Sequence, residues 1–94
     1  MAKIINLEFD KTLIGLAGNE YGRETYVNQV KDKIDLSGEN TIVIPSHIEN
    51  IAISFVQGFV DEIFEKIGKD DFFDHISIEA NEKVKNKFMK AAFF

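Results

Sequence analysis

The chain contains no cysteine and no tryptophan, one proline (Pro45) and one arginine (Arg23). Without cysteine, neither a disulfide framework nor a thiolate metal site can form. No signal peptide opens the chain, and no apolar run approaches the roughly 20 residues that a bilayer span needs. We therefore expect a soluble, cytoplasmic protein that does not enter a membrane.

Basic residues are also in the minority, because 16 acidic and 11 basic side chains give a net charge of −5. Proteins that bind nucleic acid usually gather Lys and Arg on one face. The lysines here, including those of "KVKNK" after Glu82, are interspersed with acids along the chain. The sequence therefore predicts no nucleic-acid partner.

Apolar residues are abundant, at 45% of 94 residues with nine Phe, so residues 1–94 are predicted to form a single domain. Partial alternation predicts a strand in "KIINLEF" (Lys3–Phe9), and "TLIGL" (Thr12–Leu16) is predicted to return as the second strand of a hairpin. Spacings of three and four then indicate a helix over Tyr21–Ile34. The run "TIVIP" (Thr41–Pro45) is typical of a buried central strand.

The second half of the chain carries the strongest periodicity. Apolar residues recur every three to four positions over Ser54–Ile67, which predicts a long helix that ends at Gly68. "FFDHISIE" predicts a strand around Ile76 and Ile78, and a last helix is expected from Asn81 to about Ala92. The order β-β-α-β-α-β-α predicts an α/β fold, with a mixed sheet of about four strands and helices mainly on one face.

Ser54 is the most informative polar residue. Ser54 and Gln57 have the Ser-x-x-Gln spacing of a capping box, in which the serine hydroxyl caps the helix start. A helix start also favours negative charge, so a phosphate on Ser54 would be stabilised there. The capping role and a regulatory role are compatible.

The loop "AGNEYGRE" (17–24) is the second candidate site. Glycine-rich turns between a strand and a helix can hold phosphate, so Asn19, Tyr21, Gly22 and Arg23 are a candidate turn for a nucleotide or anion sensor. The alternative is a turn that only starts the first helix, with Asn19 as its cap. Tyr21 and Arg23 are also residue types favoured in protein interfaces.

Catalysis has little support. His47 and His75 are the only histidines, no G-x-S-x-G motif surrounds Ser54, and no H-x-x-x-H pair exists. We expect no enzyme activity, no metal and no cofactor. The C-terminal "AAFF" either packs against the sheet or favours self-association as a homodimer.

The segment "TIVIPSHIENIAISFVQGFVDEIF" followed by "FFDHISIE" resembles the STAS-like domains of unknown function. These are small prokaryotic and phage-associated relatives of the sulfate-transporter and anti-sigma-factor-antagonist domain. The resemblance implies a regulatory module without enzyme activity, whose partner is a kinase-fold ATPase of the histidine-kinase type.

By position, the resemblance makes Ser54 a phosphorylation site. The partner is expected on the loop and helix start over 45–59, through Ser46, His47, Asn50, Phe55, Gln57 and Gly58. The antagonists have Asp before the serine and Gly after it, whereas this chain has Ile53 and Phe55. The expectation that Ser54 is phosphorylated, as the matching serine of the antagonists is, therefore depends on whether Phe55 leaves the Ser54 hydroxyl accessible.

Overall fold

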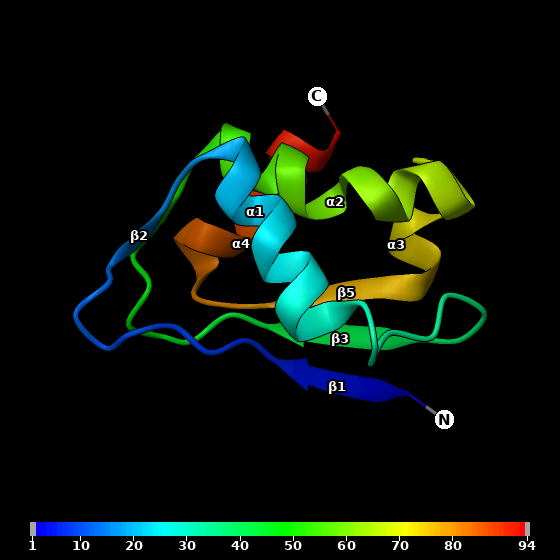
Figure 1. The fold of residues 1–94 in the computed structure, drawn as a ribbon, viewed down its shortest axis with the longest axis horizontal. Helices are drawn as coiled ribbons and strands as arrows, with labels where there is room; N and C mark the ends of the chain where they lie inside the picture. Colours follow the sequence, from blue (N-terminus) through cyan, green and yellow to red (C-terminus); the bar gives the residue numbers. More distant parts are fainter. Residues whose placement is uncertain (1, 94) are drawn as a thin grey trace.

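The computed structural model describes residues 2–93, which form a layer of helices on a small parallel sheet (Figure 1). In chain order the elements are β1 (Lys3–Asn6), β2 (Gly15–Leu16), α1 (Asn19–Thr25), a π-helical segment (Tyr26–Val30), β3 (Asn40–Val43), β4 (Asn50–Ile51), α2 (Ile53–Ile67), α3 (Phe72–His75), β5 (Ile76–Glu79) and α4 (Glu82–Ala92).

The main sheet has the strand order β1-β3-β5, and both neighbouring pairs are parallel. Alternate residues of each strand are buried, among them Ile5, Ile42 and Ile78, and these side chains face the helices. The prediction that "TIVIP" supplies the central strand is confirmed. The α/β class and helices on one face are confirmed as well.

The predicted hairpin is wrong. Asp10 does form a turn, because its carboxylate accepts hydrogen bonds from the Thr12 backbone N–H at 2.9 Å and hydroxyl at 2.7 Å. After this turn the chain does not return along β1, and β2 pairs in parallel with β4 instead. Leu16 of β2 is buried in the core beside its pairing partner Ile51. The main sheet therefore has three parallel strands rather than about four mixed ones.

Two helical boundaries also differ from the predictions. The first helix begins at Asn19 and continues as a π-helix, closed by the hydrogen bond from Lys31 N–H to the Tyr26 carbonyl at 2.9 Å. It does not reach Ile34. The "FFDH" part of the last predicted strand is the short helix α3, because Phe72 turns inward and packs its ring 5.2 Å from that of Phe64.

Helices α2 and α4 match their predictions closely. Helix α2 ends at Gly68, whose φ of 82° suits glycine. Helix α4 begins after Asn81, whose side chain accepts a hydrogen bond from Val84 N–H at 2.9 Å and donates one to the Ile48 carbonyl at 2.7 Å. Asn81 thus caps α4 and joins it to the loop after β3.

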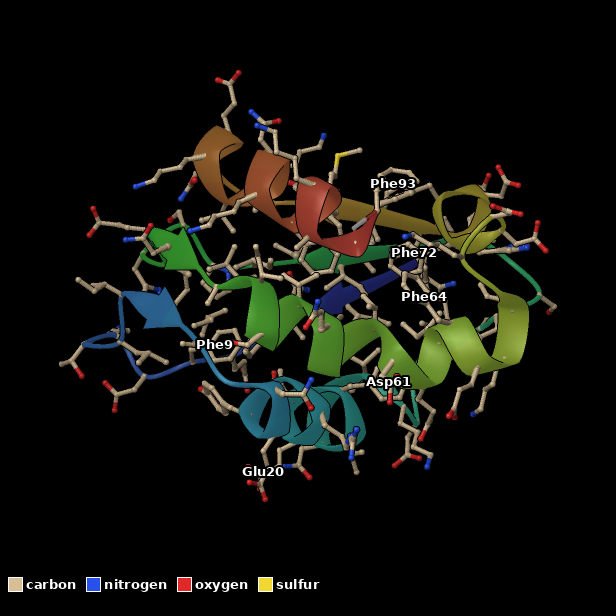
Figure 2. All side chains as sticks on the ribbon, turned by 90° about the horizontal axis from the view of Figure 1, so that it is seen from above. Phe9, Glu20, Asp61, Phe64, Phe72 and Phe93 are labelled. Atoms are coloured by element: carbon tan, nitrogen blue, oxygen red, sulfur yellow. The ribbon has the colours of Figure 1, made fainter. Side chains whose placement is uncertain are left out.

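Helix α2 lies between α1 and α4 in the helical layer (Figure 2). Gly22 and Gly58 stand at the crossing of α1 and α2. A Cβ on Gly22 would lie 2.1 Å from the Phe55 carbonyl oxygen, and one on Gly58 would lie 1.9 Å from the Asn19 carbonyl oxygen. The two backbones can approach this closely only because both residues are glycine.

Candidate functional site

The start of α2 is held by backbone contacts rather than by a side-chain cap. The residue before the helix is Ala52, in extended conformation, and its N–H donates to the Leu16 carbonyl at 2.7 Å. The hydrogen bonding between the β2 and β4 segments therefore continues up to the residue that immediately precedes α2. The first N–H groups of α2 receive no side-chain acceptor, so this end of the helix keeps its preference for negative charge.

Ser54 is the second residue of α2, not its cap, so the predicted capping box with Gln57 is wrong. Its Oγ instead accepts a hydrogen bond from Gly18 N–H at 3.0 Å. This bond joins the start of α2 to the residue that precedes α1. The hydroxyl is half-buried, and its own proton has no acceptor among residues 2–93.

Phe55, the residue after Ser54, belongs to the core. Its side chain is fully buried, with its ring 5.5 Å from that of Tyr21 and 6.1 Å from that of Phe59. Gly58 is buried at the α1–α2 crossing. Of the residues predicted to meet a partner, these two are therefore enclosed by the chain itself.

The other predicted partner residues lie at the surface or close to it. Ser46, Asn50 and Gln57 are exposed. His47 is half-buried, and its Nε2 lies 3.0 Å from the Asp10 carbonyl oxygen. Because a carbonyl can only accept, this nitrogen carries the proton and His47 links two loops.

Among residues 2–93, no hydrogen bond joins Ser54 to either histidine. The other histidine, His75, places Nδ1 2.8 Å from the Gly38 carbonyl oxygen. His75 is the last residue of α3, which lies beyond the far end of α2 (Figure 1), and α2 alone is about 22 Å long. Within residues 2–93, no three His, Cys, Asp or Glu side chains are grouped as metal ligands would be.

The predicted ligand turn is part of a helix. Asn19 is the first residue of α1, and the residue before it, with its positive φ, is Gly18. Gly22 is buried against α2, so its backbone is not open to a phosphate. Arg23 pairs with Asp61 of α2 at 3.3 Å, and Tyr21 stays partly exposed.

A basic hollow, which the sequence analysis missed, lies between the start of α2 and α4. It measures about 480 Å³. We call its lining the α2–α4 surface: Ile53, Lys83, Asn86, Lys87, Lys90 and Ala91. Ile53 is 44% exposed although it is a large apolar residue. The sequence feature that could have predicted this basic surface is the spacing of the three lysines, which recur at positions that share one face of a helix.

Charge distinguishes this surface from the opposite side of α2. There, Lys31 and Lys66 lie 3.3 and 3.4 Å from the Glu62 carboxylate. Burial opposes ionisation of Glu62, but the two ammonium groups outweigh it and lower the pKa of this carboxyl. Within residues 2–93, the three lysines of the α2–α4 surface have no such acidic partner.

Tyr26, at the start of the π-helix, is a second unusual group. Only 1% of it is exposed, and its hydroxyl has no hydrogen-bond partner among the described residues. Burial, followed by the negative charge of Glu62, raises the pKa of Tyr26 to about 12. A buried hydroxyl without a partner costs desolvation free energy that a hydrogen bond would otherwise offset.

The last described residues differ in their burial. Ala91 and Ala92 are buried, whereas Phe93 is 58% exposed with its ring 4.8 Å from that of Phe73. Phe94 lies outside the described residues. Phe93 therefore packs beside α3, while Ala91 and Ala92 belong to the core (Figure 2).

Comparisons of this chain with protein-family models, with curated proteins and with solved structures found no match. Among the helices of residues 2–93, none has both the length and the apolar character to cross a membrane.

Proposed function

We propose that this chain is a protein-interaction module without enzyme activity, and that its partner docks on the α2–α4 surface. One observation carries the proposal: an exposed isoleucine shares a hollow with three lysines that have no acidic partner within residues 2–93, on a chain whose net charge is −5. Exposed apolar groups with a polar rim are typical of interfaces. One residue of this surface, Ile53, belongs to the 45–59 segment that the sequence predicts as the docking region.

The partner that fits this surface is an acidic polypeptide segment with an apolar side chain. Ile53 and Ala91 form the apolar part of the hollow, and the three lysines surround it. Carboxylates of such a segment would meet the ammonium groups and the uncapped start of α2.

The STAS-like assignment adds a switch to this proposal. Its support is the order of strands and helices from β3 onward, together with the resemblance around Ser54. A phosphate on Ser54 would place negative charge on the residue next to Ile53. That charge would compete with an acidic partner for the same lysines. A kinase-fold ATPase is the partner class that the resemblance implies.

The test is affinity capture from the cells that make the protein naturally, with quantitative mass spectrometry. The variants are Ile53→Asp and a triple Glu substitution of Lys83, Lys87 and Lys90. The matched control is a triple Glu substitution of Lys3, Lys11 and Lys33, which are exposed elsewhere. Circular dichroism checks that every variant is folded.

The expected result is a captured protein that both surface variants lose and the control retains. Capture of the same proteins by wild type and both surface variants would refute the proposal, and so would an equal loss with the control. Incubation with the captured partner and ATP then tests the switch. An unmodified Ser54 would remove the phosphorylation but leave the docking surface standing.

A further inference from the structure

The face of the main sheet that lies away from the helices is bare. Figure 1 shows every helix on the same side of β1, β3 and β5. Purely parallel sheets are found almost only where both faces are covered. This sheet therefore lacks the second layer that its type normally has.

The strand order explains why the layer is missing. The chain crosses from β1 to β3 by way of α1, and from β3 to β5 by way of α2, always moving to the next strand in the same direction. Right-handed crossovers that move in one direction place all their helices on one face. A helix on the other face would have required the strand order to reverse.

The bare face is nearly uncharged, although charged residues make up 29% of the chain. Its residues, which alternate with the buried ones, are Ile4, Asn6, Thr41, Val43, Ser77 and Glu79. Only Glu79 carries a charge. Ile4 is 68% exposed, the highest value among the large apolar side chains of residues 2–93.

We propose that a second copy of this chain covers the bare face, as a two-fold symmetric dimer whose sheets pack face to face. Such an interface must complement itself, because the same patch is used on both copies. The α2–α4 surface is basic and cannot meet its own copy without repulsion. The bare face can, and this inference does not depend on the proposed function.

The register allows the packing without a clash of charges. Across the sheet, Ile4 is level with Thr41 and Ser77, and Asn6 is level with Val43 and Glu79. A two-fold axis along the strands places Glu79 opposite Asn6 of the partner copy. An axis across the strands places it opposite Ser77 of the partner copy. Neither arrangement brings Glu79 against itself.

The size of the face sets the strength of the dimer. Three strands of four residues cover about 13 by 14 Å, or roughly 190 Å², whereas a stable interface takes about 800 Å² from each partner. The dimer is therefore weak and reversible, and its population depends on concentration.

Sedimentation velocity and NMR dilution of the wild-type protein, from about 10 μM to about 1 mM, measure this association. We expect a reversible monomer–dimer equilibrium, with concentration-dependent amide shifts in β1, β3 and β5. Ile4→Glu and Ser77→Glu should each raise the dimer Kd about tenfold or more. Both positions are exposed, so the monomer should stay folded.

Ile14→Glu and Val27→Glu are the matched controls, because they add the same charge at exposed apolar positions away from the bare face. They should leave the dimer Kd unchanged within about twofold. A protein that stays monomeric over the whole range would overturn the proposal. So would a dimer whose amide shifts fall in α4 or at Phe93, or one that the control variants weaken equally.

Discussion

Substitution of Gly58 by alanine should destabilise the protein, although the same change normally stabilises a helix. Gly58 lies in the middle of α2, where alanine is preferred over glycine by about 1 kcal/mol. A methyl group there would lie 1.9 Å from the Asn19 carbonyl oxygen and 2.8 Å from its carbon. These are backbone atoms of α1, which cannot rotate away.

The magnitude follows from the distance. Ordinary contacts of a Cβ begin near 3.4 Å, so α1 and α2 must separate by more than about 1 Å. Overpacking of this kind costs about 1–3 kcal/mol, and sometimes more, and here the movement also loosens the buried rings around Phe55. After the gain in helix propensity, we expect a net loss of about 2 kcal/mol out of a total of roughly 5–14 kcal/mol.

Urea unfolding followed by far-UV circular dichroism measures this loss. Gly15→Ala is the control, since its Cβ would have its nearest contact at 3.8 Å, and it should change the free energy of unfolding by less than about 0.5 kcal/mol. Gly22→Ala should resemble Gly58→Ala, and the double variant should lose less than the sum because the helices have already separated. A Gly58→Ala protein as stable as wild type would refute the close crossing.

Three further predictions concern side-chain hydrogen bonds and use the same unfolding measurement. Tyr26→Phe should stabilise the protein by about 1 kcal/mol, because it removes a buried hydroxyl without a partner. Because the pKa of Tyr26 is raised from 10 to about 12 in the folded state, its contribution to the free energy of unfolding should be constant below about pH 10 and fall between pH 10 and pH 12; the variant should lack this contribution. Asn40→Ala should cost about 3 kcal/mol, because this buried amide makes hydrogen bonds of 2.7 to 3.2 Å with Asp35 and His75; a loss below about 1 kcal/mol would contradict that role. Ser54→Ala should lower the free energy of unfolding by about 1 kcal/mol, because the hydrogen bond from Gly18 is lost, whereas Gln57→Ala should leave it unchanged. Equal losses for the two variants would instead support the capping box between Ser54 and Gln57.

Periodicity along the chain predicted the elements whose burial depends on local pattern. The apolar stripe of α2, its end at Gly68 and the buried side of α4 follow from spacings of three and four residues, and each is confirmed. The central strand β3 followed from its β-branched run. The predicted return strand failed, because alternation shows that a segment can be extended but not which strand it pairs with.

The candidate site was predicted only in part, for a similar reason. Sequence spacing assigned Ser54 to the cap of its own helix, whereas the hydroxyl bonds with Gly18, 36 residues earlier in the chain. Phe55 and Gly58 were assigned to a partner, but the first fills the core and the second allows α1 to approach. The basic hollow forms because α4 lies beside the start of α2, and no local sequence pattern predicts that contact.

By itself, the sequence determined the α/β class, the central strand and the two long helices, because an apolar period specifies an element and its buried face. Only the tertiary structure decided that all strands run parallel and that one face of the sheet is left bare. It also decided that Gly22 and Gly58 meet, and that an exposed isoleucine lies among lysines. These features join residues distant in the chain, so they depend on packing that sequence spacing does not encode.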